Sequence, residues 1–270
     1  MNRFNNILQK NRESGHGIFM AGAVPGFPDL ETSFEIAKTI VTAGADILEL
    51  SASFSDPVAD GPTLQQAHNQ VLGQGIAKQQ IFQLYKQIRL AFPEIPLFVI
   101  EYANCVYHPG IDKYYQQLAQ SGVDSLLIPD LSFEEAAPFL KSALAHKIKQ
   151  VFIAAPTTPD GRILKLSEAS SDFLYLVTIT GVTGQRDQFL QETSDFIKRV
   201  KRIASLPVIA GFGIAKPEHI KQALSAGADG VVSCSPVVNL IRQNSNDKSA
   251  MMKLLTDYVK DMKAATNIGL

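Results

Sequence analysis

Acidic side chains cluster around one apolar stretch early in the chain. Ile47 to Leu50 reads as a short buried strand, yet it carries Glu49 near its carboxyl end. Asp56 and Asp60 follow in a loop whose prolines and glycine keep it from forming helix. Burying a carboxylate is costly unless the group has a partner or is neutral for part of the time. Two acids that converge on one cavity could therefore exchange protons with a substrate, whereas a buried salt bridge with turn aspartates is the structural alternative.

A second set of residues suits the binding of an anion. Gly181-Val182-Thr183-Gly184, Gly211-Phe212-Gly213 and Ser233-Cys234-Ser235 each follow a predicted strand in the second half of the chain. Glycines let backbone N–H groups approach an anion closely, and a helix that begins after Ser235 would aim its N-terminus at the same point. Ordinary tight turns between strands and helices are the structural alternative.

Short apolar strands alternate with amphipathic helices along the whole chain. Asp29 predicts an N-cap for the helix that follows it, Pro217 predicts the first turn of a helix that reaches Ala226, and residues 1–12 predict a short amphipathic helix. The predicted strands are apolar on both faces, as in a parallel sheet that helices cover. They are Ile18–Val24, Ala45–Leu50, Leu97–Ile100, Val123–Ile128, Val151–Ala154, Phe173–Val177, Val208–Ala210 and Gly230–Ser233.

A weak internal repeat indicates how these elements assemble. Gly44-Ala45-Asp46, Gly122-Val123-Asp124 and Gly227-Ala228-Asp229 each close a helix and start a strand, at intervals that fit units of about 35 to 39 residues. Eight such units fill 270 residues. We therefore predict an α/β fold in which residues 1–270 form a single (β/α)8 TIM-barrel domain with an extra N-terminal helix. A doubly wound open sheet is the alternative, but no Gly-x-Gly-x-x-Gly follows the first strand.

A barrel would bring the acids and the glycine clusters to one mouth. Active sites of such barrels lie at the carboxyl ends of the strands, and the loops after the last two strands often bind phosphate. The space between the two sets favours a flat apolar group attached to a phosphorylated tail. Five residues are positioned to line that space, with core packing as the alternative for each aromatic one: Ile100, Tyr102, Leu127, Tyr175 and Phe212.

Composition excludes several other functions. The formal net charge is −1 and no long basic block occurs, so we expect no nucleic-acid or membrane partner. Cys105 and Cys234 lack the spacing of a disulfide framework or a zinc site, so we predict no metal. No apolar run approaches the length of about 18 residues that a membrane span needs, which predicts a cytoplasmic protein. The histidines show no ligand spacing, and all are expected to be surface or incidental residues: His16, His68, His108, His146 and His219.

The segment from Glu49 to Thr63 resembles the signature of tryptophan synthase alpha subunits. It reads E-L-x-x-x-F-S-D-P-x-A-D-G-P-T, and Tyr102-Ala103-Asn104 and Gly211-Phe212-Gly213-Ile214 follow in the family's order and spacing. The resemblance implies a lyase that cleaves indole-3-glycerol phosphate into indole and glyceraldehyde 3-phosphate in L-tryptophan biosynthesis. It also implies an α2β2 heterotetramer with a beta subunit. No cofactor is expected in this chain, because pyridoxal phosphate would belong to the beta subunit.

The resemblance also implies roles for single residues. Glu49 would be the general acid/base with a raised pKa, Asp60 would stay ionised in a wetter loop and accept the indole N–H, and Tyr175 would assist. The residues that would contact the substrate are Tyr102, Ile100, Leu127, Thr183 and Phe212. Thr183 lies on a loop that is suited to closing as a lid. The phosphate would be bound by the backbone N–H groups of Gly184, Gly213, Cys234 and Ser235.

Several positions depart from the family's usual residues. Gly22 replaces a large pocket residue, and Cys234 replaces a glycine, which requires a negative φ there. Glu101 stands where the family has an apolar or small residue; strand alternation turns it toward the helix layer, where a lysine or arginine is the expected partner. These departures leave a second functional reading, a diverged alpha chain that acts mainly as a beta-binding allosteric module with low intrinsic turnover.

Overall fold

The strands form one parallel sheet. A computed structural model describes residues 2–177, 191–211 and 213–269 of the chain. Within these residues, nine parallel strands are ordered β5-β4-β3-β2-β1-β9-β8-β7-β6. They are β1 (Ile18–Ala23), β2 (Ile47–Ser51), β3 (Leu97–Ile100), β4 (Ser125–Leu127), β5 (Lys149–Val151), β6 (Ile153–Ala154), β7 (Leu174–Val177), β8 (Val208–Gly211) and β9 (Gly230–Ser233).

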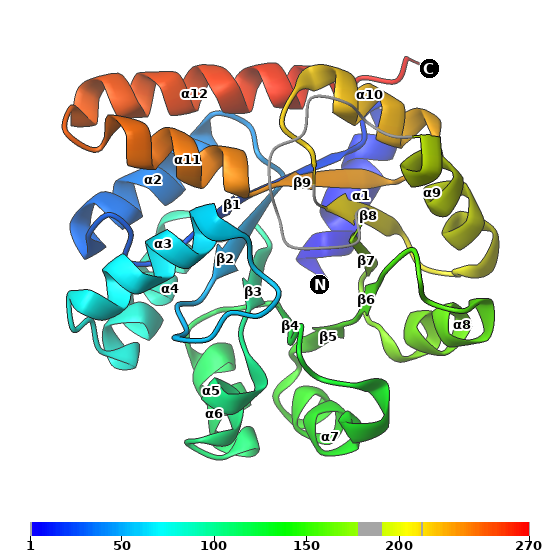
Figure 1. The fold of residues 1–270 in the computed structure, drawn as a ribbon, viewed down its shortest axis with the longest axis horizontal. Helices are drawn as coiled ribbons and strands as arrows, with labels where there is room; N and C mark the ends of the chain where they lie inside the picture. Colours follow the sequence, from blue (N-terminus) through cyan, green and yellow to red (C-terminus); the bar gives the residue numbers. More distant parts are fainter. Residues whose placement is uncertain (1, 178–190, 212, 270) are drawn as a thin grey trace.

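The two ends of this sheet are a single barrel strand. β5 ends at Val151 and β6 begins at Ile153, so only Phe152 separates the first strand of the order from the last. The sheet therefore closes on itself through the chain, and the ribbon in Figure 1 shows the strands as a ring. The predicted barrel is confirmed, and the open doubly wound sheet is excluded. Where the sequence predicts one strand from Val151 to Ala154, the structure has two short ones.

Helices surround the ring of strands (Figure 1). They are α1 (Arg3–Glu13), α2 (Leu30–Thr42), α3 (Pro62–Gly73), α4 (Lys78–Ala91), α5 (Ala103–Tyr107), α6 (Ile111–Gln120), α7 (Ala137–His146), α8 (Asp160–Ala169), α9 (Gln191–Ile203), α10 (Pro217–Ser225), α11 (Ser235–Asn244) and α12 (Lys248–Ala264), with a 3-10 helix at Phe133–Glu135. The predicted caps are present: Asp29 accepts the N–H of Thr32 at 2.8 Å, and Pro217 begins α10. None of the described helices is both long enough and apolar enough to cross a membrane.

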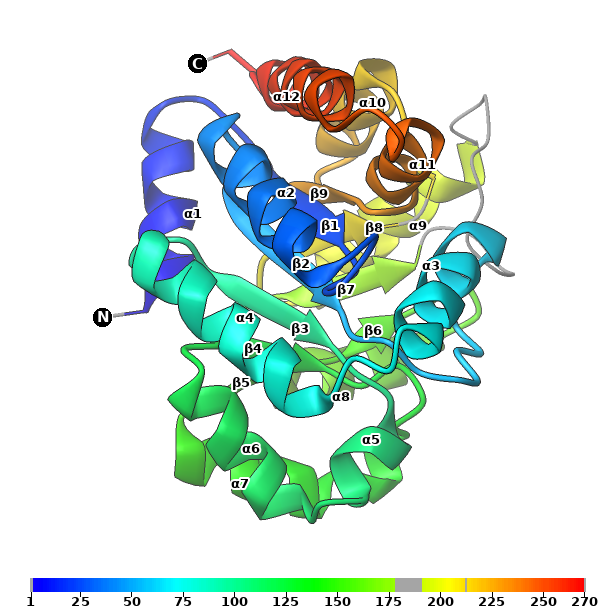
Figure 2. The ribbon, with the colours of Figure 1, turned by 90° about the vertical axis from the view of Figure 1, so that its left-hand side faces the viewer.

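The predicted N-terminal helix covers the end of the barrel at which the strands begin. Figure 2 shows α1 at that end and α3 toward the opposite one. Phe4 of α1 is buried inside the barrel, where its ring stacks on Phe173 with centroids 5.1 Å apart. Inward side chains of the strands, Phe98 and Ile209 among them, complete this inner cluster. Helix α1 thus closes the inner core at the end of the barrel where the strands begin.

The Gly-x-Asp repeat joins neighbouring strands at the covered end. Its glycines, Gly44, Gly122 and Gly227, have φ angles of 112°, 78° and 103°, a region that favours glycine. Each aspartate then accepts a backbone N–H from the strand before it. Asp46 accepts from Phe19, Asp124 from Leu97 and Asp229 from Val208, each at 2.8 Å.

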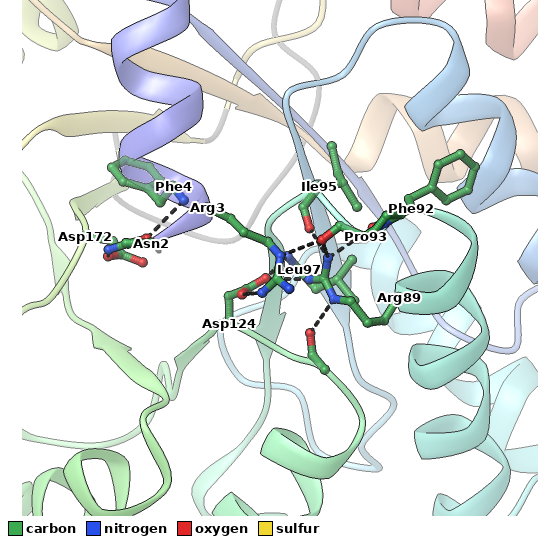
Figure 3. Close-up of polar contacts among 11 residues, drawn as sticks. Asn2, Arg3, Phe4, Arg89, Phe92, Pro93, Ile95, Leu97, Asp124 and Asp172 are labelled. Carbon is green, nitrogen blue, oxygen red and sulfur yellow. Dashed lines mark hydrogen bonds and ion pairs between the residues drawn. The ribbon is translucent and has the colours of Figure 1, made fainter.

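A cation compensates the charge of each of these aspartates. Arg3 and Arg89 both reach Asp124, at 2.7 and 2.6 Å, and Figure 3 shows Arg89 also donating to nearby backbone carbonyls. Lys263 lies 2.7 Å from Asp46, and Lys201 pairs with Asp229. The weak sequence repeat therefore marks a recurring structural unit, in which one carboxylate links a strand, its neighbour and a basic side chain.

Glu101 has the structural partner that the sequence predicts. Its carboxylate is fully buried and forms an ion pair with Lys78 of α4. It also accepts the hydroxyl of Tyr114 of α6 at 2.6 Å. The side chain therefore points into the helix layer, away from the centre of the barrel.

Candidate active site

Strand alternation points Glu49 into the barrel. Ile47, two residues earlier on β2, belongs to the inner cluster, whereas Leu48 and Leu50 pack outward against the helices. Glu49 is only 1% exposed, and one carboxylate oxygen, Oε2, accepts the hydroxyl of Tyr175 from β7 at 3.4 Å. The Cys234 thiol is a second hydrogen-bond partner of the Glu49 carboxylate.

Asp60 reaches the same cavity from the loop after β2. The Tyr102 hydroxyl donates to its Oδ2 atom at 2.7 Å and accepts the Ala59 N–H at 3.2 Å. The ring of Phe54 stacks on Tyr102, with centroids 5.0 Å apart, which packs the loop against the strand ends. Asp60 is consequently 8% exposed. Asp60 is more exposed than Glu49, at 8% against 1%, as the prediction of a wetter loop requires, but its carboxylate is still largely buried beside Tyr102.

Burial sets the protonation of both acids. Desolvation raises the pKa of Glu49 to about 7; the Cys234 hydrogen bond opposes this rise and the charge of Asp60 adds to it. Desolvation also raises the pKa of Asp60 to about 6, against the hydrogen bond from Tyr102. Near neutral pH, Glu49 can therefore both give and take a proton while Asp60 is mainly ionised.

A helix N-terminus faces the acids across the cavity. α11 begins at Ser235 directly after β9, so its first N–H groups and its dipole favour an anion at this mouth. Gly213 has a φ of 78°, a conformation that a larger residue would adopt only with strain. Cys234 has a φ of −113°, so the predicted condition for a side chain at this position is met.

One cavity at the carboxyl ends of the strands contains most of the predicted site. Its lining residues are Glu49, Ser51, Asp60, Leu64, Ile100, Tyr175, Gly213, Ile214, Ala215, Val232, Cys234, Ser235 and Pro236. Tyr102 contributes through its contact with Asp60. Leu127 packs in the inner cluster of the barrel, and a contact between it and substrate stays a prediction. The predicted residues Thr183, Gly184 and Phe212 lie outside the residues that the structure describes.

His68 is a site residue that sequence reasoning missed. It is fully buried on α3, so the prediction that all histidines are surface or incidental is wrong; His219, 3% exposed, is also buried. His68 Nδ1 accepts the Phe54 N–H at 3.2 Å, which leaves the ring proton on Nε2. Nε2 lies 3.5 Å from Asp60 Oδ2, too far for a hydrogen bond. Burial, with the charge of Lys78, lowers the pKa of His68 to about 4, so the ring is neutral at pH 7.

A helical pattern in the sequence could have revealed this histidine. Leu64, Ala67, His68 and Val71 are the buried residues of α3, spaced as one face of a helix. A polar residue on such a face needs an internal partner. For His68 that partner is the backbone N–H of Phe54, in the loop before the helix.

Substitution of His68 is expected to shift the pH dependence of the site. The His68→Asn variant would lack the ring N–H that faces Asp60, which disfavours the carboxylate and raises its pKa. The acid limb of kcat/KM should then move upward by roughly 0.5 to 1 pH unit. His146→Asn is the matched control, because His146 pairs with Asp112 on the outer helices at 2.8 Å. An unchanged acid limb in His68→Asn would show that His68 does not act on Asp60.

The described residues offer no metal centre: no group of three or more His, Cys, Asp or Glu side chains is placed to hold an ion. What the structure offers is a closed parallel barrel with two buried acids facing a helix N-terminus. This arrangement defines a barrel enzyme that works by acid–base chemistry on an anionic substrate. The family model described as tryptophan synthase alpha chain matches residues 7–267, and the chain belongs to that family.

Individual relatives match over nearly the full length. A tryptophan synthase alpha chain from Methanothermobacter thermautotrophicus is 42% identical over 251 residues, which are 93% of this chain and 93% of that protein. The solved structure of tryptophan synthase subunit alpha from Legionella pneumophila has a TM-score of 0.91 and 27% identity, with 99% of both chains covered. The structure of a tryptophan synthase complex from Pyrococcus furiosus has a TM-score of 0.84 and 30% identity, covering 92% of this chain and 98% of that one.

Proposed function

We propose that Glu49, Asp60 and Tyr175 carry out the reaction of a tryptophan synthase alpha subunit. This reaction is the retro-aldol cleavage of indole-3-glycerol phosphate into indole and glyceraldehyde 3-phosphate. The observation that supports these roles best is the burial of two acids in one cavity, with pKa values of about 7 for Glu49 and about 6 for Asp60. Two acids tuned in this way can take different parts in one reaction.

Glu49 can complete both proton transfers of the cleavage. In its neutral form it gives a proton to C3 of the indole ring, which places positive charge on the ring nitrogen. The resulting carboxylate takes the proton of the side-chain hydroxyl next to the scissile bond. The bond between the indole ring and the side chain then breaks, the aldehyde forms, and Glu49 is neutral again. The hydroxyl of Tyr175, 3.4 Å from Glu49 Oε2, helps to hold the carboxyl group during this exchange.

Asp60 is proposed to stabilise charge on the indole ring, and the phosphate site is proposed to orient the substrate. An ionised Asp60 accepts the indole N–H and stabilises the positive charge that develops there, as preorganised groups do in a buried site. Gly213, Cys234 and Ser235 are proposed to bind the phosphate through backbone N–H groups, together with Gly184. Ile100, Leu127, Tyr102, Thr183 and Phe212 are proposed to surround the indole ring and side chain. Phosphate binding away from the reacting atoms then fixes the scissile bond between the acids.

We further propose that the chain works with a beta subunit as an α2β2 heterotetramer. The relative from Pyrococcus furiosus was solved as a tryptophan synthase complex, which supports an assembly of this kind. Pyridoxal phosphate would be bound by the beta subunit, and the alpha chain needs no cofactor for a reaction that only moves protons and breaks one carbon–carbon bond. The complete set of acids favours catalysis over the alternative of a beta-binding module with low turnover.

Incubating the purified chain with indole-3-glycerol phosphate is expected to release indole, and adding the cognate beta subunit is expected to increase the rate. A neutral Glu49 and an ionised Asp60 are both required, so kcat/KM should fall below about pH 6 and above about pH 7. Rates at background in both conditions would contradict the lyase and favour the allosteric module.

A further inference from the structure

Gly22 lies where Cys234 and Glu49 meet. On β1, Gly22 is in register with Glu49 of β2, and Ala21 is in register with Ser233 of β9. Cys234 follows Ser233 directly, so its side chain arrives beside Gly22 from the opposite neighbouring strand. A Cβ atom on Gly22 would lie 2.5 Å from both Cβ and Sγ of Cys234 and 2.7 Å from Oε1 of Glu49. These distances are far inside the contact distance of about 3.5 to 4.0 Å between carbon atoms.

The Cys234 thiol and the Glu49 carboxyl group therefore occupy the space that a side chain at position 22 would fill. The Cys234 thiol forms a hydrogen bond with the Glu49 carboxylate. Burial and the charge of Glu49 raise the pKa of Cys234 well above its ordinary value, so the thiol keeps its proton and is the donor. On the other side, the Tyr175 hydroxyl donates to Oε2. Glu49 is thus held between two neutral donors from β7 and from the end of β9.

We infer that Cys234 is a positioning residue that holds Glu49 in its working orientation, and that Gly22 is required because it leaves room for this contact. The inference rests on the proposed role of Glu49 in the lyase reaction. It assigns the Cys234 side chain a task separate from the proposed backbone contact of the same residue with phosphate. Removing the side chain should therefore affect kcat and its pH dependence, and leave KM for the phosphorylated substrate nearly unchanged.

The first experiment compares Cys234→Ala with Cys234→Ser. The groups that face Glu49 are Cys234, Asp60 and Tyr175. Of these, Cys234 and Tyr175 favour the ionised form, so loss of the thiol raises the pKa of Glu49. The alkaline limb of the kcat profile should move upward by roughly 0.5 to 1 pH unit in Cys234→Ala and return close to its original position in Cys234→Ser, which keeps a donor.

Cys105→Ala is the matched control, because Cys105 lies outside the cavity and next to Glu101. Its alkaline limb should coincide with that of the original protein. An unchanged limb in Cys234→Ala, or equal shifts in the alanine and serine variants, would overturn the inference.

The second experiment tests whether a side chain at position 22 disturbs Glu49 and Cys234. Gly22→Ala should lower kcat at least about 10²-fold, since its methyl group displaces Glu49 or Cys234 and small misplacements cost that much. Adding Cys234→Gly to Gly22→Ala should recover at least about tenfold of this loss, because the double variant removes both contacts with Cys234 and leaves only the one with Glu49 Oε1. Contacting residues show this kind of non-additivity. Additive losses, or a fully active Gly22→Ala variant, would contradict the inference.

A direct titration separates this inference from the proposed function. Carboxyl-carbon NMR of glutamate-labelled protein reports the pKa of Glu49 without any turnover. If the original protein releases no indole but the Glu49 resonance titrates at higher pH in Cys234→Ala, the lyase proposal fails and the contact stands. If indole is released and the resonance does not move, the contact fails and the lyase proposal stands.

Discussion

Replacing Glu49 with glutamine is expected to lower kcat for indole release by at least about 10³-fold, within the range found for general acid–base groups. Glutamine has nearly the same shape but can neither give a proton to indole C3 nor take one from the side-chain hydroxyl. The measurement is steady-state indole release from the purified variant, with KM for indole-3-glycerol phosphate determined in parallel. A Glu49→Gln variant as active as the original protein would refute the acid–base assignment.

The same substitution should stabilise the folded protein at alkaline pH. The folded pKa of about 7 lies above the reference value of 4.5, so the folded protein keeps a proton on Glu49 that the unfolded chain has lost. The free energy of unfolding therefore falls as pH rises from about 4.5 to about 7, by about 3 kcal/mol in total. Glu49→Gln lacks this titration and should be more stable than the original protein at pH 8, with the difference vanishing near pH 4. Urea unfolding at the two pH values measures it.

Glu101→Gln is the matched control for Glu49→Gln. Glu101 is an equally buried acid, but its charge is compensated by Lys78 and it faces the helix layer. Its loss should reduce the free energy of unfolding, since Lys78 and Tyr114 lose their charged partner. Indole release should stay within a few-fold of the original rate. Glu49→Gln is thus expected to lower activity and to raise stability at pH 8. Glu101→Gln is expected to lower stability and to leave activity nearly unchanged.

Replacing Asp60 with asparagine should lower kcat/KM about 10²- to 10³-fold, the usual cost of removing one group that stabilises transition-state charge. Asparagine keeps an oxygen near the Tyr102 hydroxyl but brings no negative charge to the indole nitrogen. The acid limb of the pH profile near pH 6 should also disappear, because Asp60 titrates there.

Asp56→Asn is the control for Asp60→Asn, since Asp56 lies in the same loop but is exposed. It should leave indole release by the isolated chain unchanged. An acid limb that persists unchanged in Asp60→Asn would belong to another group, such as the substrate phosphate, and would refute the assignment to Asp60.

Local patterns predicted the framework of the barrel. Apolar runs located eight of the nine described strands, because a strand that is buried on both faces leaves a short continuous signal. They missed most of β5, since Lys149 and Gln150 come before the apolar run. The Gly-x-Asp repeat marked three turns correctly. The division of one strand at Phe152 was not predictable, because no glycine or proline interrupts the apolar run there.

The sequence predicted those site residues whose own strand or loop marks them, and not those whose surroundings come from distant parts of the chain. Glu49 was found because a carboxylate in an apolar strand stands out by itself. The burial of Asp60 was missed because it depends on Phe54, Tyr102 and His68, whose positions follow from tertiary packing. The fit between Gly22 and Cys234 joins residues more than 200 positions apart, and neither residue signals the other in the sequence.

The Gly-x-Asp turns have a consequence for protein engineering. They link neighbouring strands at the end of the barrel opposite Glu49 and Asp60, and their charges are already compensated by Arg3, Arg89, Lys201 and Lys263. Substitutions that stabilise these turns are therefore expected to act at the end of the barrel away from the proposed site. Selection for greater thermal stability can then change residues around these turns while the two buried acids at the other end stay unchanged.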